Sequence, residues 1–214
     1  MNITIIGAGN MGRGIGTRAV TGGHSVNFVG RNLEVLDKVA AEVRAFAKDG
    51  AKVSTATLDE AEFGDVVVFA VWYGANIELA KQLGNKLAGK VVVDIANPLN
   101  STFDGLATAP DSSSAEDLAK AIANGAKVVK AFNTTYAGTL LTGEVAGQQL
   151  DVFIAGDDAD AKAKVVQLVT DGGMRAVDAG PLSRARQIEG MQFLHIVTQG
   201  TLGTNWGSAL KILS

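Results

Sequence analysis

Apolar runs of strand length alternate with segments of helical periodicity along most of the chain. Residues 65–71 and 90–96 are almost continuously apolar, as expected of parallel strands that are covered on both faces. Strands are predicted at residues 2–6, 25–29, 51–54, 65–71, 90–96, 126–132, 150–155 and 174–178.

The segments between these runs carry apolar residues three or four positions apart, which is the spacing of one helix face. Asn32 and Ser113 stand where two of these helices begin, as capping residues do. The alternation of strand and helix predicts an α/β fold with a doubly wound parallel Rossmann sheet. Helices are predicted at residues 13–21, 33–47, 77–87, 114–124, 160–170 and 183–202, and a helical turn at 59–63.

The pattern changes after residue 134. It thins over residues 136–147 and is irregular again from 205 onward, but no linker or low-complexity tract interrupts the chain. We therefore expect a dinucleotide-binding domain over residues 1–134. A smaller C-terminal α/β part over residues 135–214 should pack directly on it.

The last predicted helix carries an apolar face longer than a small C-terminal part needs. Its residues Ile188, Met191, Leu194 and Val197 recur at helical spacing. We expect a homodimer that buries this face. The alternative is that the face packs only on its own sheet.

The first strand runs into a glycine-rich turn with the spacing G-x-G-x-x-G, and a helix follows. In this context Gly7 permits a tight turn, Gly9 lets the backbone approach a pyrophosphate, and Gly12 lets helix and strand pack closely. Free N–H groups at the helix start then face the phosphates. The alternative is a purely structural turn. The predicted phosphate-binding residues are Gly7, Ala8, Gly9, Asn10, Met11 and Gly12.

The residues after the second strand predict which dinucleotide binds. An NAD site usually places an acidic residue there for the adenosine ribose, but this chain has Gly30, Arg31 and Asn32. A guanidinium can hold a 2′-phosphate through two parallel hydrogen bonds, and Asn32 can add a donor. We therefore predict NADP over NAD. The alternative is that Arg31 is only an exposed surface charge.

Residues after the other strands should meet at the same edge of the sheet, because ligands bind beyond the carboxyl ends of parallel strands. Trp72, with Tyr73, could form an aromatic wall for the flat nicotinamide ring, or could be an ordinary core aromatic. Asn97 by itself is more typical of a turn. The nicotinamide-side candidates are Ala70, Val71, Trp72, Ala96, Asn97, Pro98 and Asn133.

Composition narrows the function. The 214 residues carry a net charge of −3, which argues against nucleic-acid binding, and include no cysteine, which excludes disulfides and thiolate chemistry. No apolar run has the length of a membrane span and no signal peptide is evident, so a soluble cytoplasmic protein is expected. Most Asp and Glu residues are expected on solvated helix faces. Of the two histidines, His24 should lie at the end of the sheet away from the chemistry, and His195 is expected to be packed. We therefore predict neither a catalytic side chain nor a metal site.

Five segments together resemble a known family. IIGAGNMG, VGRN, VVVDIANPL, VVKAFNT and DAGPLSRARQIEG are similar to segments of the NADPH-dependent reductases of the deazaflavin coenzyme F420. The same modules resemble the cytosolic NADPH-binding domain of the six-transmembrane metalloreductases. The resemblance covers nearly the whole chain. Residues 128–134 and 178–189 are its most specific parts, because unrelated dinucleotide domains have no reason to carry both.

The resemblance implies hydride exchange between NADP(H) and the deazaflavin, with flavin as a substitute acceptor. It implies that the glycine turn holds the pyrophosphate and that Arg31 and Asn32 hold the 2′-phosphate. Trp72, Asn97, Pro98 and Asn133 would line the nicotinamide. The C-terminal part would close over the acceptor and pair the subunits. No side-chain base is needed, because the two rings carry the chemistry.

Two other functions remain open from the sequence. One is an NADPH-dependent dehydrogenase or imine reductase of a small carbon substrate, which uses the same N-terminal architecture. The helix that starts at Ser183 offers only Arg184, Arg186, Glu189 and His195 as candidate groups for such chemistry. The other is a non-catalytic NADP(H)-sensing module, which would bind the dinucleotide without turnover.

Overall fold

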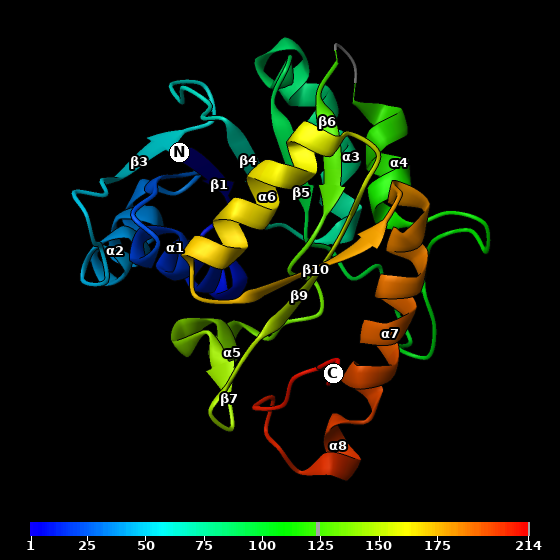
Figure 1. Cartoon of the computed structure of the whole chain (residues 1–214). Helices are drawn as coiled ribbons and strands as arrows, with labels where there is room; N and C mark the ends of the chain where they lie inside the picture. The colour runs from blue at the N-terminus through cyan, green and yellow to red at the C-terminus, as the bar shows by residue number, and fades with distance from the viewer. Residues whose placement is uncertain (123–124, 214) are drawn as a thin grey trace.

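A single sheet runs through the whole molecule (Figure 1). The computed structural model describes residues 1–122 and 125–213. Within them, eight strands form this sheet in the order β10-β9-β6-β5-β4-β1-β2-β3. Strands β1 to β6 thus have the classic doubly wound order, with a switch point between β1 and β4. The strands are β1 Asn2–Ile6, β2 Ser25–Gly30, β3 Val53–Thr57, β4 Val66–Phe69, β5 Val91–Asp94, β6 Lys127–Lys130, β9 Asp151–Gly156 and β10 Arg175–Gly180.

Helices cover both faces of the sheet. On each face, a cluster of buried hydrophobic side chains lies between the sheet and its helices. Side chains of α1, α2, α5 and α6 meet one face, and those of α3, α4 and the start of α7 meet the other. The helices are α1 Asn10–Thr21, α2 Leu33–Arg44, α3 Tyr73–Leu83, α4 Ser114–Ala121, α5 Ala137–Thr142, α6 Ala159–Asp171, α7 Ala185–Val197 and α8 Gln199–Leu202; 3₁₀ turns are η1 Gly84–Leu87 and η2 Leu182–Arg184.

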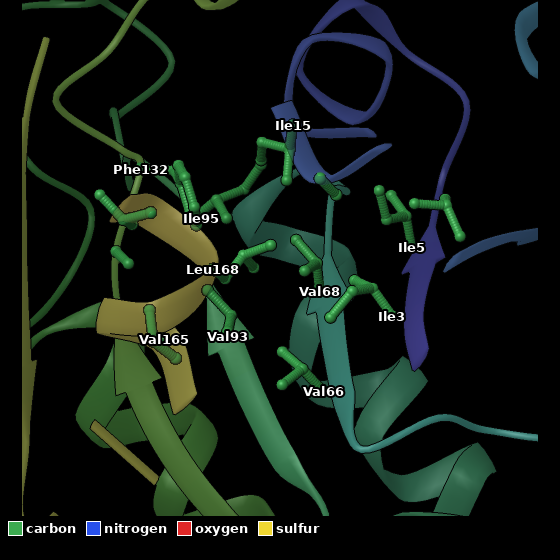
Figure 2. Packing of buried hydrophobic residues seen from close by; sticks show 14 of the residues in the cluster. Ile3, Ile5, Ile15, Val66, Val68, Val93, Ile95, Phe132, Val165 and Leu168 are labelled. Carbon is green, nitrogen blue, oxygen red and sulfur yellow. The ribbon is translucent and has the colours of Figure 1, made fainter. Parts of the chain in front are cut away.

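Successive side chains of each strand point to opposite faces of the sheet and so pack into different layers, as the pleat of a strand requires. Figure 2 shows Ile3 and Ile5 of β1 with Val66 and Val68 of β4, in the layer that also holds Ile15 of α1. The intervening residues of these strands face the other helices. Burial on both faces explains the continuous apolar runs that predicted the central strands.

The structure confirms the α/β class and the doubly wound arrangement and corrects one detail of the sheet. Strand β9 pairs with β6 in the antiparallel sense, and β10 then pairs parallel with β9. The connection from β6 to β9 contains α5 and the hairpin of β7 (Glu144–Val145) and β8 (Gln148–Gln149), which the sequence pattern did not predict. Strands β9 and β10 of residues 135–214 extend the same sheet, and the division into two domains stays a prediction.

The predicted boundaries need several corrections. The turn at 59–63 is not helical, and β3 overlaps the predicted strand 51–54 but begins two residues later and ends at Thr57. Helix α3 starts at Tyr73 instead of 77 and gives way to a 3₁₀ turn after Leu83. Helix α4 ends at Ala121; the rest of the predicted helix to Asn124 includes positions outside the described residues.

The predicted helix 183–202 is not continuous. It consists of η2, α7 and α8, and the chain turns at Thr198. Its four-residue apolar face is also divided. Ile188 is buried against β9, whereas Leu194 is 62% exposed and Val197 is 46% exposed. Leu194 and Val197 are the more exposed part of this face, and Met191 is partly buried.

Candidate functional site

Two of the three glycines in the G-x-G-x-x-G turn are required by packing. Gly7 has a φ of 109°, and a Cβ there would lie 2.4 Å from the carbonyl oxygen of Ala70. A Cβ on Gly12 would lie 2.4 Å from the carbonyl oxygen of Gly7. Both distances are far below van der Waals contact, so any larger residue forces the turn, strand β4 or helix α1 to move.

Gly9 differs from its two neighbours. Its φ of −76° suits any residue, and a Cβ built on it meets nothing within 4 Å. The fold therefore does not require glycine there. A pyrophosphate bound against this backbone would require glycine, because it would take the space that a side chain occupies.

Helix α1 begins at this open position. Gly9 is its N-cap, no side chain caps the helix, and its first turn contains no acidic residue. The first N–H groups of a helix have no partner within the helix, and the helix dipole is positive there. The start of α1 therefore has the polarity of an anion-binding site.

A cleft of about 470 Å³ opens beside the turn, between the ends of β1 and β2 and helix α3. It brings together six of the predicted residues, and Leu79 and Ala75 of α3 add an apolar wall. Arg31 is exposed at this cleft, and no hydrogen bond or ion pair from another described residue occupies its guanidinium. Asn32 caps α2 as predicted, accepting a hydrogen bond of 3.2 Å from the N–H of Val35. The predicted residues in the cleft lining are Gly7, Ala8, Gly30, Arg31, Asn32 and Val71.

The nicotinamide-side candidates follow β4, β5 and β6. Asn97 and Asn133 are joined by two hydrogen bonds: the Asn97 amide donates to the Asn133 carbonyl at 3.0 Å, and the Asn133 amide donates to Asn97 Oδ1 at 3.0 Å. Ala96 and Pro98 are buried beside them. Trp72 is 85% exposed at the start of α3, so it is not a core aromatic.

Behind these residues lies a charged cluster that the sequence analysis missed. The ammonium of Lys130 donates to Asp94 Oδ2 at 2.8 Å, to Glu189 Oε1 at 2.7 Å and to the carbonyl oxygen of Ala96 at 2.6 Å. All three charged side chains are completely buried. The expectation of solvated acidic residues is therefore wrong for Asp94 and Glu189. The sequence did offer one sign of this cluster: Asp94 and Lys130 are charged residues at matching positions in two apolar strand runs.

Neighbouring groups complete the cluster. Asn76 of α3 donates to Asp94 Oδ1 at 2.9 Å, and the N–H of Ser114, at the start of α4, donates to both oxygens of Glu189. Burial raises the pKa of Glu189 above its ordinary value, although the Lys130 ammonium acts against it. Burial by itself would lower the pKa of Lys130, but the two carboxylates outweigh it and raise that pKa. Lys130 therefore stays charged.

Both histidines have structural surroundings. His195 is packed, as expected: its ring nitrogens lie 3.2 Å from Gln192 Oε1 and 2.7 Å from Ser208 Oγ, and burial lowers its pKa. His24 lies just before β2, between the chain's amino group and Asp171. Among the described residues, no group of three or more His, Asp or Glu side chains is arranged to hold a metal ion. In the same residues, no helix is long and apolar enough to cross a membrane.

Known proteins are similar to this chain in sequence and in structure. Residues 2–98 match the family described as coenzyme F420-dependent NADP oxidoreductase. The F420-dependent NADP reductase of Methanothermobacter marburgensis is 33% identical over 88% of this chain and 88% of its own length. Metalloreductase STEAP3 of Rattus norvegicus is 32% identical over 87% of this chain but 35% of its own length. A crystal structure from Arthrobacter sp. FB24 covers 99% of both chains with a TM-score of 0.84 and 30% identity. The similarity thus extends well beyond the glycine turn.

Proposed function

The chain belongs to the family of F420-dependent NADP oxidoreductases, and we propose on this premise that it transfers a hydride between NADP(H) and coenzyme F420. The observation that carries the proposal is the extent of the similarity. Three archaeal F420-dependent NADP reductases are 30%, 32% and 33% identical to this chain, and each similarity covers 88% of it. It therefore includes the C-terminal part as well as the dinucleotide turn.

The described residues fit NADP(H). The open backbone at Gly9 and the uncapped start of α1 suit the pyrophosphate, and the exposed guanidinium of Arg31 suits the 2′-phosphate. The apolar wall of α3 suits the adenine. In this assignment the adenosine half lies over β1 and β2. The nicotinamide half lies over the carboxyl ends of β4, β5 and β6, across the switch point.

When bound, NADP(H) and coenzyme F420 supply the hydride donor and acceptor. The protein's task is to hold the two rings against each other and to exclude water. Asn97 and Asn133 help to hold the ring on the nicotinamide side, because their mutual hydrogen bonds tie the turns after β5 and β6 together. We assign the acceptor side to residues 135–214, which follow directly from these turns. The proton that the reduced deazaflavin takes up after the hydride comes from solvent, so no protein group exchanges a proton in this scheme.

Direct hydride transfer is tested with labelled cofactor. With NADPH deuterated on the transferred face, the chemical step should slow, and the label should arrive on C5 of the deazaflavin without a covalent enzyme intermediate. Flavin is the second acceptor in the assay. Reduction of a small imine or carbonyl substrate, with neither deazaflavin nor flavin reduced, would overturn the assignment in favour of the imine-reductase type. Tight NADPH binding without any turnover would instead indicate a sensing module. The relatives described above favour neither alternative.

We also propose that two copies of the chain pair through the C-terminal helices. Leu194 and Val197 of α7 and Leu202 of α8 are exposed apolar residues that follow one another along the chain. If these side chains form one exposed apolar surface, it is of the kind that marks an interface. Light scattering at micromolar concentration should give twice the 22.0 kDa chain mass. Leu194→Glu should give the single chain mass, because a carboxylate cannot be buried without a partner. A monomeric parent protein would refute the proposal.

A cytoplasmic location stays a prediction.

A further inference from the structure

The buried cluster lies where the nicotinamide half of the site is assigned. Asp94 and Lys130 are the last residues of β5 and β6 and face each other in the register of these strands. Both therefore lie at the carboxyl edge of the sheet, where ligands bind. Glu189 reaches them from α7, which packs beside α4 (Figure 1).

The cluster holds the backbone on both sides of one residue, Ala96. The carbonyl oxygen of Ala96 accepts a hydrogen bond from Lys130, and the N–H of Ala96 donates to Asp94 Oδ1 at 3.2 Å. Ala96 is followed by Asn97, which is tied to Asn133. The orientation of the turn at residues 96–98 thus depends on charged groups that lie behind it and do not reach the cleft.

Stability alone is a weak reason for such a cluster. Replacing buried ion pairs with apolar residues of similar volume is often neutral or stabilising, because the charges lose their hydration. The residues two positions earlier in these strands, Val92 and Val128, lie on the same face of the sheet and show that this layer accommodates valine. Valine side chains supply neither the hydrogen-bond donor nor the acceptor that orient the backbone at Ala96.

We propose that Lys130 and Glu189 are positioning residues, which hold the turn at residues 96–98 in the orientation that the nicotinamide ring needs for hydride transfer. Lys130 acts directly on the Ala96 carbonyl. Glu189 acts through Lys130, because it binds the same ammonium that Asp94 binds. Asp94, Lys130 and Glu189 are not among the described residues that line the cleft assigned to the adenosine half. The inference rests on the proposed function only in assigning the ring to this edge of the sheet.

The test is Glu189→Gln, which keeps the size of the side chain and removes its charge. Two ligands are titrated: NADPH, and 2′-phospho-ADP-ribose, which has no nicotinamide. We expect the affinity for 2′-phospho-ADP-ribose to change less than about twofold and that for NADPH to fall several-fold more. We expect kcat with coenzyme F420 to fall roughly ten- to a hundredfold, since small misplacements of a reacting ring carry penalties of that order. Lys130→Met should show the same selectivity with larger effects.

Asp151→Asn is the matched control. Asp151 is also a completely buried carboxylate, but its ion-pair partners are Arg175 and Lys211, which are not members of the cluster. Its loss should lower the melting temperature without changing the ratio of the two affinities. If Glu189→Gln lowers both affinities equally, or leaves kcat unchanged, the cluster is only structural and the inference fails. If the parent protein reduces no deazaflavin, the proposed function fails, but the ratio of affinities still decides the inference. If Lys130→Met does not fold, Glu189→Gln still decides it.

Discussion

Gly9→Val should abolish binding of both NADPH and NADH while the protein without cofactor stays folded. Valine fits the local backbone, because φ is −76° and ψ is 179°, and its Cβ would meet nothing within 4 Å. The branched side chain would then stand where the pyrophosphate must approach the start of α1. We expect an affinity loss of at least about a hundredfold, or roughly 2.7 kcal/mol. A fall of only a few degrees in melting temperature is expected from the poorer N-cap.

Two other glycine variants make this result specific. Gly12→Ala should destabilise the protein itself, because its Cβ would lie 2.4 Å from the Gly7 carbonyl oxygen. Gly200→Val, in α8, also meets nothing within 4 Å and should leave cofactor binding unchanged. Titration calorimetry and thermal unfolding without cofactor separate these outcomes. Equal losses of stability and affinity in Gly9→Val would mean that Gly9 has a structural role and would remove the support it gives to the phosphate site.

Arg31→Ala should weaken NADPH selectively. The Arg31 guanidinium is exposed at the cleft, so it can pair with a phosphate without first breaking a contact of its own. A charge-assisted hydrogen bond contributes about 1.5–3 kcal/mol, which corresponds to a roughly ten- to a hundredfold increase in the NADPH dissociation constant. NADH has no 2′-phosphate, so its affinity should be almost unchanged.

Arg44→Ala is the control for the loss of a positive charge. Arg44 lies at the end of α2 and donates to the carbonyl oxygen of Val53, away from the cleft. It should affect neither cofactor by more than about twofold, the small change expected when a charge is screened by solvent. If Arg31→Ala weakens NADPH and NADH equally, Arg31 does not read the 2′-phosphate, and NADP selectivity must come from elsewhere in the site.

The glycine turn and the cofactor choice were predictable because their determinants are local. Residues 7–12 lie in one short stretch, and the packing reasons for Gly7 and Gly12 follow from a strand that turns directly into a helix. Asn32 caps the helix that follows it within three residues. The strands were predictable because burial on both faces requires apolar residues in sequence, whatever their order in the sheet.

Contacts between distant residues were decided by the tertiary structure. Lys130 meets Asp94 and Glu189 across 36 and 59 positions of sequence, so no local pattern marks these charges as partners. Their burial depends on the pairing of β5 with β6 and on the placement of α7. The direction of β9 and the exposure of Trp72 and Leu194 likewise depend on which elements pack together. The sequence by itself determined the α/β class and the dinucleotide turn, because both follow from near neighbours along the chain. Only the folded chain decided what lies behind the turns after β5 and β6, because the residues of that cluster come from separate elements.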